Sequence, residues 1–115
     1  MLSLQSKLRR IGEALDTALP GLASHYYRKP ASYPACIWQE DGEGESFRAD
    51  FREREQAIHG TVDYFTQTEY DPNIDVIQDV LNGIMHTWRI KSVQYEEETK
   101  LIHYEWEWEA STIVV

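Results

Sequence analysis

Apolar residues near the start of the chain recur with the period of a helix. Five of them follow one another at spacings of four, three, four and four residues, namely Leu4, Leu8, Ile11, Leu15 and Leu19. These spacings place them on one face of a helix over residues 3–19. We expect that helix to end before Pro20 and Gly21, because Pro cannot extend the hydrogen-bond ladder and Gly accepts a left-handed helix terminus.

A second helix is predicted over residues 71–85. Asp71 can accept free amide hydrogens at a helix start, and Pro72 fits the first helical turn without losing a needed donor. The apolar residues that then recur at helical spacing are Ile74, Ile77, Leu81 and Ile84. This face should pack against a sheet.

The segments between the two helices have the patterns of strands. Short aromatic-rich stretches predict strands at residues 24–29 and 33–40, and regular alternation predicts another at residues 56–66. One face of the third strand consists of Ile58, Gly60, Val62 and Tyr64. Residues 41–50 are acidic, contain two glycines and show no periodicity, so we expect a flexible hairpin loop there.

The C-terminal third predicts a β-hairpin, with arms at residues 88–95 and 101–109 around a polar loop. Alternation in the second arm gives one apolar face, formed by Ile102, Tyr104, Trp106 and Trp108. We expect this face to be buried and the opposite face, with Leu101, His103, Glu105 and Glu107, to lie in water.

Together these elements predict a single α+β domain over residues 1–115. The domain has an N-terminal helix, a mainly antiparallel sheet of four to five strands, and a second helix packed on the sheet before the C-terminal β-hairpin. The residues expected in its core are Leu8, Ile11, Leu15, Ile37, Val62, Ile77, Leu81, Ile84, Ile102, Tyr104 and Trp106.

The charge balance disfavours several classes of function. Twenty acidic against eleven basic residues give a formal net charge of -9, which repels phosphate and anionic lipid. No run approaches the ~20 apolar residues of a membrane helix, so we expect no membrane partner. A single cysteine and the lack of an apolar secretory segment after the N-terminal basic residues favour an intracellular protein.

No catalytic motif stands out. Cys36 lies in an apolar string and is expected to be a small buried hydrophobe. The four histidines lack the spacing of a zinc motif, so we expect neither metal nor cofactor. The α-carbons of Glu105 and Glu107 are separated by roughly 6.6 Å along a strand. This distance overlaps the spacing between the two carboxyl groups of inverting glycosidases. Alternating glutamates are also what a solvated strand face needs, and this interpretation is favoured.

The hairpin offers two kinds of surface. Trp106 and Trp108 fit core packing against a helix, or a subunit interface, where tryptophan concentrates binding energy. The acidic loop fits either a soluble hairpin tip or a contact or channel lining. The residues that could form a subunit or channel surface are Glu96, Glu97, Glu98, His103, Glu105 and Glu107.

The order of elements and several short strings resemble a known family. The strings are Pro34-Ala35-Cys36-Ile37-Trp38, the strand at residues 61–65, the helix at residues 71–85 and, above all, residues 95–106. With the helix-first order, they resemble the tail terminator and head-tail joining (tail completion) proteins of long-tailed bacteriophages and prophages. The resemblance covers nearly the whole chain, through order, length and short strings.

The resemblance implies a structural protein and no enzyme. Such a protein forms a hexameric ring, caps the tail tube and presents a surface to the head connector protein. DNA would contact it only in passage through the channel, and the family offers no catalytic residues or cofactors to carry over. The expected location is the bacterial cytoplasm during assembly, then the virion tail.

Two alternatives remain open from the residues. The -9 charge and small size also fit an acidic inhibitor that mimics DNA, although basic residues are interspersed among the acids at residues 51–55. A small hydrolase using Glu105 and His103 is the weaker alternative.

Overall fold

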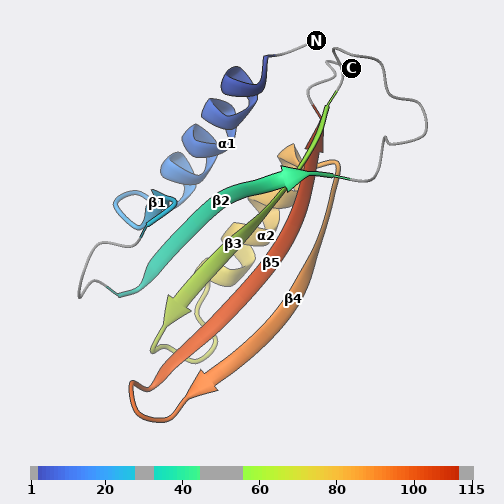
Figure 1. The fold of residues 1–115 in the computed structure, drawn as a ribbon. Coiled ribbons are helices and arrows are strands. Elements are labelled where there is room, and N and C mark those ends of the chain that lie inside the picture. The colour runs from blue at the N-terminus through green and yellow to red at the C-terminus, as the bar shows by residue number, and fades with distance from the viewer. Residues whose placement is uncertain (1–2, 28–32, 45–55, 112–115) are drawn as a thin grey trace.

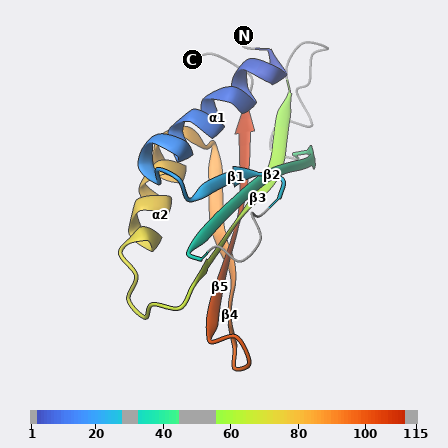
Figure 2. The ribbon, with the colours of Figure 1, turned by 90° about the vertical axis from the view of Figure 1, so that its left-hand side faces the viewer.

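A computed structural model of the chain describes residues 3–27, 33–44 and 56–111. In chain order its elements are α1 (Leu4–Ala18), β1 (Ala23–His25), β2 (Ala35–Glu43), β3 (Ala57–Thr66), α2 (Asn73–Ile84), β4 (Thr87–Glu96) and β5 (Leu101–Ser111). The described strands form one sheet in the order β1-β2-β3-β5-β4. Both helices cover the same face of this sheet, as Figures 1 and 2 show together. The α+β prediction is confirmed.

Helix α1 follows its sequence pattern closely. The Ser3 side chain caps it by accepting a hydrogen bond from the Ser6 amide at 3.1 Å, as its place at the start of the pattern allows. The predicted face turns inward, because Leu8, Ile11, Leu15 and Leu19 are buried. Leu4, on the same face by spacing, is 36% exposed at the first turn.

The first two strands differ from their predicted bounds. Strand β1 begins one residue before the predicted segment and ends at His25, while residues 28 and 29 of that segment lie outside the described residues. It pairs in parallel with β2, and every other pairing in the sheet is antiparallel.

The predicted loop at residues 41–50 is wrong at its start. Strand β2 continues through Asp41 and Gly42 to Glu43, with an irregularity between Glu40 and Gly42. Pairing with β3 overrides the polar composition, and the Asp41 carboxylate bonds the His59 ring at 2.6 Å. Residues 45–50 of that prediction lie outside the described part of the chain.

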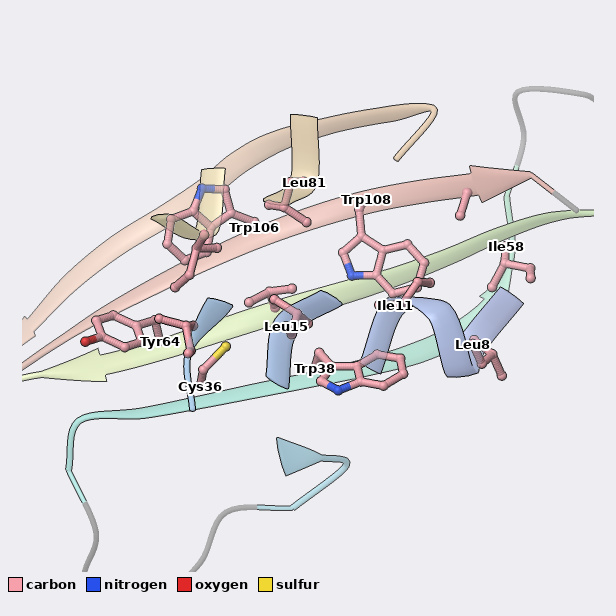
Figure 3. Packing of buried hydrophobic residues seen from close by; sticks show 14 residues of the cluster. Leu8, Ile11, Leu15, Cys36, Trp38, Ile58, Tyr64, Leu81, Trp106 and Trp108 are labelled. Atoms are coloured by element: carbon pink, nitrogen blue, oxygen red, sulfur yellow. The ribbon is translucent and has the colours of Figure 1, made fainter. Parts of the chain in front are cut away.

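The core lies between the sheet and the two helices. Figure 3 shows Trp106 and Trp108 pointing from β5 into this layer, together with residues of α1 and α2. The predicted core residues that are buried there are Leu8, Ile11, Leu15, Val62, Ile77, Leu81 and Trp106.

Four other predicted core residues are only half-buried, so the core prediction is wrong for them. They are Ile37, Ile84, Ile102 and Tyr104. Ile37 is opposite Asp63 in the β2–β3 register, on the sheet face away from the helices. Ile84 and Tyr104 pack against the margin of the core. Ile102 pairs with Tyr95 near the hairpin tip, at the end of the sheet.

A glycine makes room for one of the buried tryptophans. Gly60 lies directly opposite Trp108 in the β3–β5 register. A Cβ at this position would meet the Trp108 ring at 2.2 Å and the Gln39 carbonyl oxygen at 2.3 Å. The buried indole therefore occupies the space that any other residue would need.

Asp71 joins the end of β3 to the start of α2. One carboxylate oxygen accepts hydrogen bonds from the hydroxyls of Tyr64 and Thr66, both at 2.7 Å. The other accepts the Asn73 amide at 2.9 Å, which satisfies one of the free donors at the helix start. The predicted role of Asp71 is thus confirmed, although α2 itself begins two residues later.

Candidate functional site

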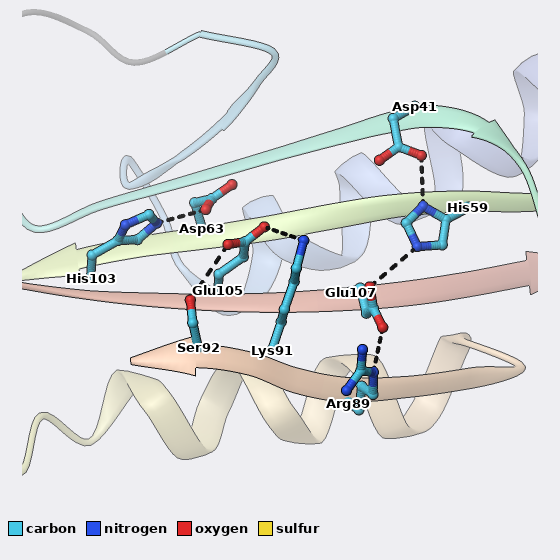
Figure 4. Close-up of polar contacts among 9 residues, drawn as sticks. All are labelled: Asp41, His59, Asp63, Arg89, Lys91, Ser92, His103, Glu105 and Glu107. Carbon is cyan, nitrogen blue, oxygen red and sulfur yellow. Dashed lines mark hydrogen bonds and ion pairs between the residues drawn. The ribbon is translucent and has the colours of Figure 1, made fainter. Parts of the chain in front are cut away.

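The sheet face opposite the helices, here called the open face, carries most of the predicted surface residues. Paired residues of neighbouring strands point to the same face, so the register places Glu105 beside Asp63 and Glu107 beside Arg89. Trp106 and Trp108 alternate with these glutamates and point to the helices. Figure 4 shows the resulting row of polar contacts across four strands. The nine residues drawn there include four carboxylates and two cations.

Glu107 lies at the centre of a chain of charges. It accepts a hydrogen bond from the Arg89 guanidinium and lies 3.6 Å from the His59 ring, which also bonds Asp41. The hydrogen bond from Arg89 lowers the pKa of Glu107 and outweighs the opposing effect of burial. Glu107 is therefore a stable carboxylate near neutral pH.

Glu105 has a separate set of partners. Its carboxylate lies 3.7 Å from the Lys91 ammonium group and 3.5 Å from the Ser92 hydroxyl. Both partners belong to β4, so these contacts join the edge strand to its neighbour β5. The side chain is 25% exposed, and Leu101, which was expected on the same wet face, is buried. The expectation of a face in water is therefore wrong for Leu101, and the rest of this face is only partly wet.

His103 is held at the other end of the open face. Its ring bonds the Asp63 carboxylate at 2.6 Å and stacks on Phe65 with ring centroids 4.2 Å apart. Burial raises the pKa of Asp63 against the opposing hydrogen bond and charge of His103. The His103–Asp63 contact ties β5 to β3.

The acidic tip is exposed to solvent. Glu96 ends β4, and its carbonyl oxygen accepts the Lys100 amide at 2.9 Å across the turn. Glu97 and Glu98 are exposed in this turn. The Gln67 side chain donates to the Thr99 carbonyl oxygen at 2.9 Å and so links the tip to the loop before α2.

The geometry does not favour acid–base catalysis by these carboxylates. A general acid of a glycosidase needs a raised pKa, whereas that of Glu107 is lowered. His103 and Glu105 lie on the same face, yet each bonds a different partner. Cys36 is fully buried as predicted, and burial raises the pKa of its thiol to about 12, so it is no nucleophile.

Three of the nine residues in this network were predicted from the sequence as surface candidates. His103, Glu105 and Glu107 were accessible from alternation alone, and the same alternation in β3 puts His59 and Asp63 together on the opposite face from Val62. The partners on β2 and β4 require the strand register and order, which the sequence does not contain. Within residues 3–27, 33–44 and 56–111, no group of three or more His, Cys, Asp or Glu side chains is arranged to hold a metal.

Two further surface features were not predicted. One is a row of exposed apolar residues on β4, and the other is a hollow between α1 and the β1 edge.

In the described part of the chain, neither helix is long and apolar enough to cross a membrane. The chain matches no model of a known protein family, and it matches no curated protein.

Proposed function

We propose that the chain is a structural tail protein of a phage or prophage, which caps the tail tube and joins the tail to the head as a ring. Its partners would be further copies of itself, the tail tube protein and the head connector protein. The main support is that one whole sheet face and both sheet edges remain uncovered by the helices, on a small domain built in the order that the resemblance implies.

The open face suits contact with passing DNA without retention. Asp41, Asp63, Glu105 and Glu107 are distributed along it, and Arg89 and Lys91 balance them only in part. A surface of this kind repels phosphate at short range while staying rigid through its cross-strand contacts. This supports the open face as the channel lining.

The DNA-mimic alternative draws less support. A mimic needs carboxylates that are free to meet the cations of a partner protein. Glu105 and Glu107 instead contact cations of the same chain, and Asp63 bonds His103. The exposed acids at the hairpin tip are too few to imitate a long phosphate track.

Electron microscopy of tail tubes tests the proposal. Tubes polymerised from the tail tube protein of the same genome are incubated with the gold-labelled chain, and tube length is measured with and without it. The proposal predicts label at one end only and an arrest of growth. Tubes that grow unchanged, or that carry label along their length, would refute it.

A pair of matched variants asks whether the open face takes part. Glu105→Gln with Glu107→Gln removes two charges from the open face, and Glu97→Gln with Glu98→Gln removes two from the exposed tip. Because the open face is assigned to the channel, both variants should cap tubes. Joined particles made with the first variant should retain DNA in the channel, detected as slower release in a dye assay. Equal release from both would remove the channel assignment.

A further inference from the structure

Helix α1 and strand β1 lie at one edge of the sheet (Figure 1), and a hollow opens between them. This α1 hollow has a volume of about 600 Å³, which is within the usual range of binding pockets. Along α1 its lining runs from Gln5 to Asp16, which corresponds to roughly 16 Å of helix. That length matches about five residues of an extended chain.

Strand β1, beside this hollow, has backbone groups that no described strand uses. The Leu22 carbonyl oxygen and the Tyr26 amide form hydrogen bonds with β2. Residues whose backbone groups point to β2 alternate with residues whose groups point away, so those of Ala23 and His25 point to the outer side. In the described part of the chain, no strand pairs with β1 on that side. The β1 edge can therefore accept an added strand.

The register of β1 fixes where the side chains of an added strand would point. Ala23 and His25 pair with Cys36 and Trp38, which are buried on the helix side of the sheet. Residues opposite one another on neighbouring strands share a face. The residues of an added strand opposite Ala23 and His25 would therefore point into the α1 hollow, with the residue between them on the open face.

An aromatic stack forms the side of the hollow next to β1. The His25 ring stacks on Tyr26 and on Trp38, with centroids 3.7 and 3.8 Å away. Neighbouring residues of a strand point to opposite faces, but the φ of 75° at Tyr26 ends this alternation and lets its ring join that of His25. Tyr26 is 55% exposed. Its ring offers a face to a guanidinium or ammonium group.

One carboxylate is fixed against this stack. Glu40 bonds the His25 ring at 2.8 Å and accepts a hydrogen bond from the Tyr26 hydroxyl at 2.5 Å. Burial works to raise the pKa of Glu40, but the hydrogen bonds from Tyr26 and His25 outweigh it and hold the pKa below its usual value. The carboxylate stays charged near neutral pH, and its two oxygens can accept further donors.

Two more carboxylates line the α1 side of the hollow. Glu13 and Asp16 are exposed, and neither forms an ion pair with any residue that the structure describes. With Glu40, three carboxylates line the hollow beside one arginine, Arg9. Acids that are free of cations from their own chain can bind the cations of a partner.

We propose that the α1 hollow and the β1 edge bind an extended basic segment of a different protein. The segment adds to the sheet as a strand through the backbone groups of Ala23 and His25. Its arginine or lysine side chains, two positions apart, enter the hollow and meet the aromatic stack and the three carboxylates. A basic partner also complements the net charge of -9. The inference goes beyond the proposed tail function and does not depend on it.

A fluorescent peptide that alternates arginine with threonine is the probe. Fluorescence anisotropy should show saturable binding that weakens as salt is added, because salt screens the charges. A peptide with glutamate in place of arginine should not bind. The arginine peptide with N-methylated backbone amides keeps its charge but loses its backbone donors, and should bind about tenfold more weakly.

Variants of the chain test the side of the hollow that meets the basic side chains. Glu13→Gln with Asp16→Asn should weaken peptide binding by about tenfold. The matched control, Asp75→Asn with Asp79→Asn, removes two exposed charges from α2 and should bind like the unaltered chain. Tyr26→Gly removes the stacking ring at a φ that glycine adopts freely, and should weaken binding by about fivefold. Circular dichroism confirms that each variant is folded.

Amide hydrogen exchange followed by NMR locates the bound peptide. Binding should slow exchange at the backbone amides of Ala23 and His25 and leave the amides of β4 unchanged. A peptide that does not bind at millimolar concentration, or that binds without slowing exchange at Ala23 and His25, would overturn the inference. Equal binding by the N-methylated peptide, or by the Glu13 and Asp16 double variant, would overturn it too.

The tube experiment remains separate from this one. A chain that caps tubes but ignores the peptide would refute the basic partner alone. A chain that binds the peptide but ignores tubes would refute the tail function alone.

Discussion

Replacing Asp71 by Ala should destabilise the chain more than any other single change at the β3–α2 connection. The carboxylate is 8% exposed and accepts three hydrogen bonds, from Tyr64, Thr66 and the Asn73 amide. In the alanine variant the two hydroxyls lose their acceptor inside the protein. The Tyr64 oxygen keeps one bond, because the Asn73 side-chain amide donates to it at 2.9 Å.

The magnitude follows from the bonds that are lost. Hydrogen bonds to a charged group contribute about 1.5–3 kcal/mol each, and three bonds on one carboxylate are not additive. We therefore expect the free energy of unfolding to fall by about 3–5 kcal/mol, in the range where buried networks are broken. Asp75→Ala, in the exposed first turn of α2, serves as the control and should cost at most about 1 kcal/mol through the helix dipole.

The effect should depend on pH with a defined sign. Burial works to raise the pKa of Asp71, but the hydrogen bonds from Asn73, Thr66 and Tyr64 outweigh it and hold the pKa below its usual value. A lowered folded pKa contributes stability above the unfolded pKa of about 3.9. That contribution is lost as the pH falls through the folded pKa. The gap between the parent chain and Asp71→Ala should thus shrink on acidification.

Urea denaturation followed by circular dichroism at neutral and acidic pH measures both quantities. A loss below about 1 kcal/mol at neutral pH, or a gap that widens as the pH falls, would refute the network as the anchor of α2. An unchanged slope of free energy against urea would show that the native surface is retained.

Three further predictions concern the sheet. Gly60→Ala should lower the free energy of unfolding by at least about 3 kcal/mol, because the new Cβ meets Trp108. Gly83→Ala, which has open space around it in α2, should instead raise the free energy of unfolding by about 0.5–1 kcal/mol. Urea titrations measure both changes. Cys36 should react with a thiol reagent only at the rate of unfolding, and fast native labelling would contradict its burial. The double variant Glu105→Lys with Glu107→Lys should stay folded, but its free energy of unfolding should fall by about 1–2 kcal/mol because the new lysines face Lys91 and Arg89. Calorimetry that shows no loss of stability would disprove those contacts.

Periodicity predicted the parts of the fold that one residue spacing defines. The apolar face of α1 was correct apart from Leu4 at its first turn, and Trp106 and Trp108 of the predicted β5 face are buried, because one side of each element packs on the core. The assignment of Ile37 to the core was wrong. The apolar string around it does not alternate, so the sequence gives no signal for which residue of β2 points to the helices.

The sequence predicts which residues of one strand belong to the candidate surface, but not their partners on the neighbouring strands. Alternation placed His103, Glu105 and Glu107 together, but the identity of their partners depends on register. Asp41 illustrates the limit, because its acidic, glycine-containing surroundings indicate a loop while its bond to His59 belongs to a strand pair.

The position of the gold-labelled chain on tail tubes tests the central claim most directly. Electron micrographs of tubes from the same genome should show label at a single end, with shorter tubes than in its absence. Label that is absent, or distributed along the tube wall, would contradict a role in capping the tail.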